Sequence, residues 1–252
     1  MMRFHHVYVL CALALTSGTV SAGIVTYDAN AAFVANELGV TETNPSFGPF
    51  KVGYSGTNGV FTEFNASDHT NNWLGNTAMQ GFDVNNYDPA VVVNTSVSSQ
   101  NVITGAPNPL PIDPSQILMH PGNTSSTNEN AILRFIAPTA GVYVITGDFE
   151  SLHWGVTNNA VFHNGVSLFS STADNSNFDL TATLAVNDHI DFVVNRGGDA
   201  YNGDSTGLRA SLSLTQAVPE PSTAIATGLL GVVGFAGRRR RRRSSDSLPK
   251  RE

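Results

Sequence analysis

Three stretches decide the fold: Phe178–Leu184 (FDLTATL), Ile190–Val194 (IDFVV) and Leu208–Leu214 (LRASLSL). Apolar side chains occupy alternate positions in each, and in the first and third the positions between them carry Asp, Thr, Arg and Ser. Successive side chains of a strand point to opposite faces of its sheet. The alternation therefore predicts strands with one buried face and one face in water.

A tight turn is predicted at Asn164-Gly165, which separates Ala160–His163 from Val166–Phe169. A type I′ turn needs positive φ at both central residues, and Asn-Gly is the strongest short signal for it. We therefore expect a β-hairpin here. The run Val142–Ile145 is apolar at every position, which predicts a central strand covered on both faces.

The first half of the chain is richer in Asn, Gly, Ser and Pro. Its one helix candidate is Ala29–Leu38. The stretch Gly105–Pro114 carries four prolines and is interpreted as a long loop without strands. Many short strands without an obligatory helix, and without an internal repeat, predict an all-β fold, an antiparallel β-sandwich of jelly-roll type.

The N-terminal end has the three parts of a secretory signal peptide. Arg3 precedes the apolar run Val7–Leu15, and small residues lead up to Ala22. We expect cleavage between Ala22 and Gly23, and hence the Sec export machinery and signal peptidase as partners. A buried N-terminal strand or helix is the alternative.

The only cysteine is Cys11, inside the segment expected to be removed. The mature body would then contain neither a disulfide nor a thiolate metal site, so its stability must come from packing. Cys11 could instead be a lipoprotein attachment site, but the bulky Leu10 precedes it and it lies very early in the chain.

Three adjoining segments follow the body near the other end. They are Val218-Pro219-Glu220-Pro221-Ser222-Thr223, the apolar run Ala224–Gly237, and an arginine cluster that begins with Arg238, Arg239 and Arg240. In this order the segments resemble a PEP-CTERM tail, which implies sorting and processing by an exosortase. The prolines would hold an extended backbone for the enzyme, and the arginines would stay on the cytoplasmic side of the membrane.

The apolar run is short for a permanent anchor. Fourteen helical residues reach only about 21 Å, against a hydrocarbon core of about 30 Å. We therefore expect residues 224–237 to enter the membrane transiently as a short apolar helix, although a lasting anchor with snorkelling arginines is an alternative. The sequence continues through residues 244–252, interpreted as a disordered tail, whereas the family's tails usually stop soon after the basic cluster.

The predicted organisation is a signal peptide (1–22), one β-sandwich body (23–218, best patterned over 117–214), the sorting signal (219–243) and the tail (244–252). The body holds four basic residues against seventeen acidic ones, a net charge of −13. An acidic body repels phosphate backbones, so we expect it not to bind nucleic acid despite the arginine cluster.

A second resemblance covers residues 117–214. Phrases such as LRFIAPTAGVYVITGDF and DHIDFVVNRGGDAYNGDSTGL are similar to a module that recurs ahead of PEP-CTERM tails. Such modules look like carbohydrate-binding jelly rolls. The phrases are largely structural, so the resemblance implies the fold more than any ligand.

The sequence contains no nucleophile elbow, zincin helix, phosphate-binding glycine loop or cysteine pair, and we expect no enzyme. Asp148 and Glu150 are too close in sequence to flank a glycosidic bond from opposite sides, so a solvated strand face is the interpretation.

Two metal hypotheses remain open. The histidines His153, His163 and His189 lack a recognisable zinc spacing. Asp199, Asn202 and Asp204 could bind calcium, which would be the one cofactor, but residues of these types also stabilise turns.

The aromatic candidates for stacking on a sugar are Trp73, Trp154 and Tyr201, although tryptophan in a β-sandwich is more often core. The expected function is therefore that of an exported protein of the cell envelope, outer surface or extracellular matrix that contacts exopolysaccharide. A purely structural surface protein and an extracellular glycan hydrolase are the alternatives.

Overall fold

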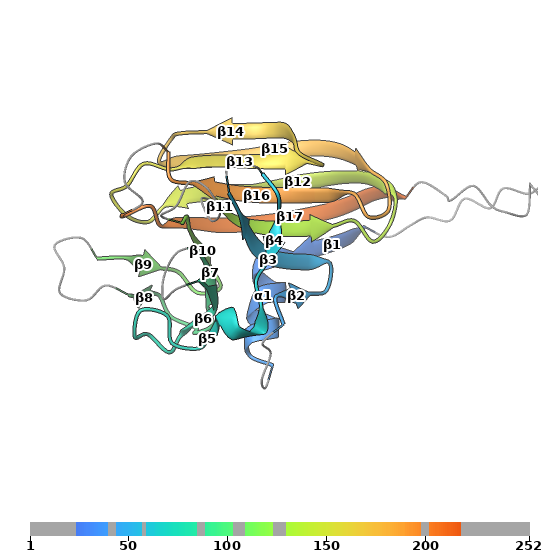
Figure 1. Cartoon of the computed structure of the whole chain (residues 1–252). Helices are drawn as coiled ribbons and strands as arrows, with labels where there is room; N and C mark the ends of the chain where they lie inside the picture. The colour runs from blue at the N-terminus through green and yellow to red at the C-terminus, as the bar shows by residue number, and fades with distance from the viewer. Residues whose placement is uncertain are drawn as a thin grey trace, which may run out of the picture.

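The computed structural model describes residues 24–39, 44–56, 59–84, 89–102, 109–122, 130–197 and 202–217. The predicted signal peptide, sorting signal and tail lie outside these residues. Two antiparallel sheets pack face to face (Figure 1).

The larger sheet runs in the order β15-β12-β17-β10-β7-β6-β5, and β1 also pairs with β17. Its strands are β1 (Val25–Asp28), β5 (His69–Thr70), β6 (Met79–Asp83), β7 (Ala90–Asn94), β10 (Ile117–His120), β12 (Gly141–Ser151), β15 (Asn175–Leu184) and β17 (Thr206–Ala217).

The second sheet runs in the order β14-β13-β16-β11-β3-β2, with β4 paired to β3. Its strands are β2 (Ser46–Phe47), β3 (Phe50–Ser55), β4 (Thr62–Glu63), β11 (Asn130–Ile136), β13 (Asn158–His163), β14 (Val166–Ser171) and β16 (His189–Asn195). The remaining elements are helix α1 (Ala29–Glu37), the 3-10 helix η1 (Ala66–Asp68) and the strand pair β8 (Gln100–Asn101) and β9 (Pro111–Ile112).

The chain crosses between the two sheets repeatedly from β11 onward. Strands β12, β15 and β17 belong to the larger sheet, whereas β11, β13, β14 and β16 belong to the other. The alternating apolar residues of these strands meet between the sheets, where Phe178, Phe192 and Leu212 are buried. The predicted antiparallel β-sandwich of jelly-roll type is confirmed.

The helix and hairpin predictions are also confirmed. Helix α1 begins at Ala29 because the Asp28 side chain accepts a hydrogen bond from the Ala31 N–H at 2.9 Å, which caps the helix. Asn164 and Gly165 have φ of 48° and 80° and connect β13 to β14, as a type I′ turn requires.

Two local predictions are wrong. Strand β12 is central, between β15 and β17, but Val142 and Val144 are only half-buried because they lie on its outer, polar face rather than between two layers. Pro111 does take part in a short strand. It begins β9 in a sheet of only two strands, a position where a missing N–H is tolerated.

A smaller apolar cluster packs on the outer side of β7 and β10, apart from the core between the sheets. It contains Trp73, Met79, Val92, Leu118 and neighbours. Every residue of β7 is buried because this cluster covers its second face. Trp73, with 2% of its surface exposed, is therefore core, and its candidacy as a sugar-stacking residue was wrong.

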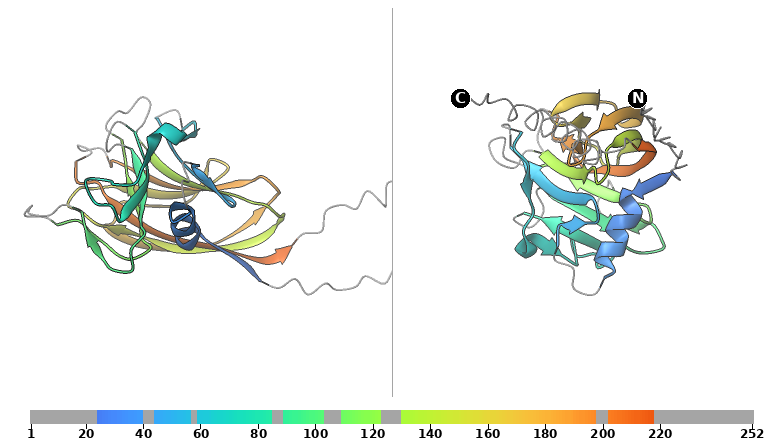
Figure 2. Two further views of the ribbon diagram at one scale, coloured as in Figure 1. Left: turned by 90° about the horizontal axis from the view of Figure 1, so that it is seen from below. Right: turned by 90° about the vertical axis from the view of Figure 1, so that its right-hand side faces the viewer.

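The two ends of the described chain lie at the same end of the sandwich. Val25 of β1 is opposite Leu214 of β17, and Gly141 of β12 is opposite Ala217 (Figures 1 and 2). We call this end the tail pole. The opposite end, where β17 begins, is the loop pole; the twelve residues of β17 place it about 40 Å away.

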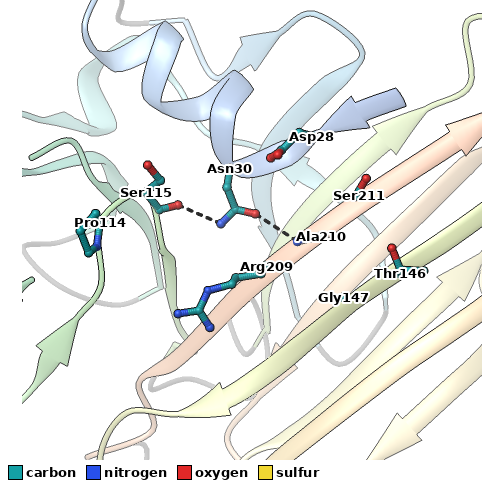
Figure 3. A pocket seen from close by; sticks show the side chains of 9 residues that line it. All are labelled: Asp28, Asn30, Pro114, Ser115, Thr146, Gly147, Arg209, Ala210 and Ser211. Carbon is teal, nitrogen blue, oxygen red and sulfur yellow. Dashed lines mark hydrogen bonds between the residues drawn. The ribbon is translucent and has the colours of Figure 1, made fainter. Parts of the chain in front are cut away.

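One side chain joins the helix to this long strand. Strand β17 pairs with β10 near its start and with β1 near its end, along the same edge. Between the two, the Asn30 amide donates to the Leu208 carbonyl at 2.8 Å. It also accepts from the Ala210 N–H at 3.0 Å and donates to the Ser115 carbonyl (Figure 3). Asn30 therefore forms hydrogen bonds with backbone groups of β17 that lie between the part paired with β10 and the part paired with β1. A hollow of about 280 Å³ lies beside these bonds. We interpret it as part of the contact between the helix and β17 and not as a ligand site.

Asn30→Ala should lower the free energy of unfolding by roughly 2–4 kcal/mol, because it leaves buried backbone groups without partners. Chemical denaturation measures the change. Asn36→Ala is the matched control in the same helix. Its bonds to Glu37 and Asn44 are only partly buried or exposed, so the change should stay within about 0.5 kcal/mol. Equal losses in both variants would refute the role of Asn30.

Candidate functional site at the loop pole

Two loops meet at the loop pole and continue the pairing of β12 with β17. The Leu152 N–H donates to the Ser205 carbonyl at 3.0 Å, and the Gly155 N–H donates to the Gly203 carbonyl at 2.8 Å. These bonds tie residues 152–157 to residues 202–205. The loops are thus extensions of the two longest strands.

Trp154 projects from the first loop, with 59% of its surface exposed. Its indole lies over the backbone of Gly203, where φ is +85° and a Cβ would lie 2.7 Å from the ring. Only glycine suits this position, since both the backbone conformation and the contact exclude a side chain. Trp154 is therefore not a core residue, and one face of its ring packs on the Gly203 backbone.

Two neighbours extend this surface. The His153 ring lies 5.7 Å from the Trp154 ring, centroid to centroid, and Val156 is 48% exposed. We call His153, Trp154, Val156 and the Gly203 backbone the Trp154 platform. An exposed indole offers a flat apolar face that can stack on the C–H face of a sugar, with its N–H available for a hydrogen bond.

The residues predicted to bind calcium occupy different environments. Asn202 is exposed, whereas Asp204 is fully buried beneath the loop, with its carboxylate close to Gly155. Asp199 lies outside the described residues, as does Tyr201, the predicted partner of Trp154. Within the described ranges, no group of three His, Cys, Asp or Glu side chains is placed to hold a metal ion.

The three candidate histidines do not converge. His153 is at the loop pole, whereas His163 and His189 lie at the tail pole, where their strands β13 and β16 meet. His163 Nε2 lies 3.1 Å from the Asp188 carboxylate, and His189 Nε2 lies 3.7 Å from Asp191. Burial is the main cause that lowers the pKa of His189. The first contact joins β13 to the turn before β16 and the second lies within β16, so the histidines do not form a shared metal site.

Asp148 and Glu150 share the outer face of β12, as expected, and both contact Arg209 across the strand pair. The Arg209 guanidinium lies 3.2 Å from Asp148, 3.1 Å from Glu150 and 2.9 Å from Asp113. Sequence alternation placed Arg209 on an outer face but could not reveal this cluster, because the pairing of β12 with β17 is not local. The two carboxylates therefore belong to an ion-pair network.

We compared the chain with known protein families, curated proteins and solved structures, and the matches cover different parts of it. Residues 217–242 match the PEP-CTERM protein-sorting motif, and no curated protein matches the chain. No helix within the described ranges has both the length and the apolarity needed to cross a membrane.

Two solved structures are partly similar. The structure of CBM51 from Clostridium perfringens GH95 in complex with methyl-galactose is 14% identical, with a TM-score of 0.32 over 49% of this chain and 88% of that one. The crystal structure of pika GITRL is also 14% identical, with a TM-score of 0.25 over 39% of this chain and 95% of that one. The sandwich is established by its own sheets, and neither similarity adds to it.

The motif implies an exosortase as the processing partner, and it marks an exported protein tied to the cell envelope. Its first residue, Ala217, is also the last residue of β17, so the sorting motif follows the sandwich without a linker. The chain is a β-sandwich protein that carries a PEP-CTERM protein-sorting motif.

Proposed function

We propose that this protein is a non-catalytic polysaccharide-contacting module of the outer surface or extracellular matrix. Sec export and signal peptidase deliver it, residues 224–237 enter the membrane transiently, and exosortase processes the tail. The Trp154 platform makes the contact with polysaccharide.

The observation that carries the proposal is the exposed indole of Trp154, which rests on the hydrogen-bonded backbone of Gly203. Large aromatic side chains are usually mostly buried in a monomer, and exposing one without a ligand costs solubility. Because Gly203 and the paired loops already hold the ring, binding loses little side-chain entropy, which favours affinity.

The position of the platform supports the same function. The motif leaves the sandwich at the tail pole, and Trp154 lies at the opposite end. A module attached or processed at the tail pole would therefore present the platform outward, about 40 Å beyond its point of attachment. A purely structural protein has no need of an apolar ring at that place.

Trp154→Ala should abolish retention on insoluble or immobilised polysaccharide, because the stacking surface is lost. The melting temperature should change by less than about 3 °C, since an exposed side chain adds little to stability. A glycan array followed by affinity electrophoresis measures retention. Unchanged retention would contradict the platform, and unfolding of the variant would mean that Trp154 is needed for the fold.

A second variant displaces the ring without removing it. Gly203→Ala should reduce retention as Trp154→Ala does, because the new Cβ would lie where the indole rests. Gly75→Ala is the matched control, since Gly75 has a similar φ of +80° with nothing within 4 Å of its Cβ position. It carries the same backbone strain and should keep retention. A loss of retention in the control would mean that strain alone explains the effect.

The mature surface protein should have lost both ends and run from near Gly23 to near Pro219. Its formal charge should then move from −7 for the whole chain to about −13, since the tail carries most of the arginines. Intact mass and isoelectric focusing of the surface fraction, compared with an exosortase-deficient strain, measure this. Mature protein that still carries Arg238–Arg243 would refute tail removal and favour a lasting anchor.

Calcium remains a proposal for Asp204 and the neighbouring loop. If the ion binds only the folded body, a chelator should lower the melting temperature by mass action, and added calcium should restore it. An identical melting curve with and without chelator would refute calcium binding.

A further inference from the structure

The outer face of the second sheet carries three rows of residues that cross its strands in register. The row nearest the loop pole is polar: Asn158, Asn195, Asn130 and Ser55. The middle row is apolar or small: Ala160, Val193, Ile132 and Gly53. The third row is Phe162, Asp191, Arg134 and Lys51. Residues of all three rows line a hollow on this face, a trough that runs across β13, β16 and β11.

The row nearest the loop pole forms the polar wall of the trough, and hydrogen bonds between its side chains hold it in place. The Asn195 amide donates to Asn130 at 2.7 Å, and the Asn130 amide donates to Ser55 at 2.9 Å. Asn158 begins the row, is exposed, and makes no side-chain hydrogen bond to the rest of the described chain. It therefore offers a donor and an acceptor to a ligand, at a fixed place beside Asn195.

The third row forms the opposite wall of the trough, and its charged side chains already form ion pairs. Arg134 binds Asp191 through two bonds, of 2.6 and 2.8 Å, and Lys51 binds Glu63 at 2.7 Å. The Arg134 guanidinium also lies 4.1 Å from the centre of the Phe61 ring. No unpaired charge faces the trough from these side chains, so an ionic ligand would gain little there.

Phe61 lies at the Gly53 end of the middle row. Its ring covers Gly53, where a Cβ would lie 2.7 Å from it. The hollow that remains measures about 310 Å³, and Ala160, Val193 and Ile132 line its floor. This volume is at the small end of the range for ligand sites, enough for one compact group and not for a large aromatic cofactor.

We propose that the trough binds the acetamido group of a neutral, N-acetylated amino sugar within a polysaccharide chain. The methyl group would pack on the apolar floor, and the amide would pair with Asn158. A plain hydroxylated sugar would instead place polar groups over Ala160 and Val193, which costs hydrogen bonds. This inference rests on the proposed function, since it names the sugar class that the same module selects.

The trough continues from the Trp154 platform. After Trp154 and Val156 the chain enters β13 at Asn158, and the Val156 carbonyl lies against Gly197. The Gly197 N–H in turn donates to the Asn195 side chain at 3.1 Å. These contacts connect the segment that carries Trp154 to the polar row of the trough.

The test uses two soluble probes with the same linkage, a β-1,4-linked tetramer of N-acetylglucosamine and the corresponding tetramer of glucose. Isothermal titration of the body should show tighter binding of the acetylated tetramer. Asn158→Ala should weaken it about three- to tenfold, the effect of one or two hydrogen bonds. Ala160→Leu should weaken it more than about tenfold, because the added carbons fill the trough.

Controls with matched chemistry lie on the outer face of the other sheet. Asn177→Ala and Thr181→Leu change exposed residues of β15 and should bind both probes as the unmodified body does. Melting temperatures within about 3 °C of the unmodified body confirm that each variant is folded.

The outcomes separate this inference from the proposed function. Equal affinity for the two tetramers, or full affinity in Asn158→Ala and Ala160→Leu, would overturn the trough even if Trp154 still supports retention of polysaccharide. Failure of the acetylated tetramer to bind at all would also overturn it. The proposed function fails only if polysaccharide retention does not depend on Trp154.

Discussion

The backbone pairing of β17 is the constraint on which the rest of the structure depends. This last strand binds β12 along one edge, and β10, Asn30 and β1 share its other edge. It thereby joins the start, the middle and the end of the described chain without any disulfide, since the only cysteine is Cys11. The sorting motif begins at Ala217, so it follows directly on the strand that completes the fold.

Much of the fold could be predicted because its signals are local. Alternation over Phe178–Leu184 and Leu208–Leu214 shows one wet face and one buried face, and Asn164-Gly165 specifies its turn by backbone conformation alone. The errors arose where burial depends on distant partners. Val142 and Val144 are apolar yet lie on an outer face. Trp73 is buried in a second cluster to which distant residues such as Leu110 and Ile112 contribute.

The candidate site was predictable only in part. Trp154 next to Gly155 suggested a presenting loop, but its support by Gly203 depends on a contact across almost fifty residues. The rows of the trough also require the register of four strands, which no single stretch of sequence contains. The same long-range pairing therefore positions the core, the platform and the trough, and it places the platform at the end of the sandwich opposite the sorting motif.

The most direct test of the central claim follows the two tryptophan indole N–H signals of the isotope-labelled body by NMR during titration with a polysaccharide that the body retains. The chain contains only Trp73 and Trp154, so each signal can be assigned with one variant. We expect the Trp154 signal to shift saturably while that of the buried Trp73 stays in place. A Trp154 signal that does not move while backbone amides elsewhere shift would contradict the claim that polysaccharide binds on this ring.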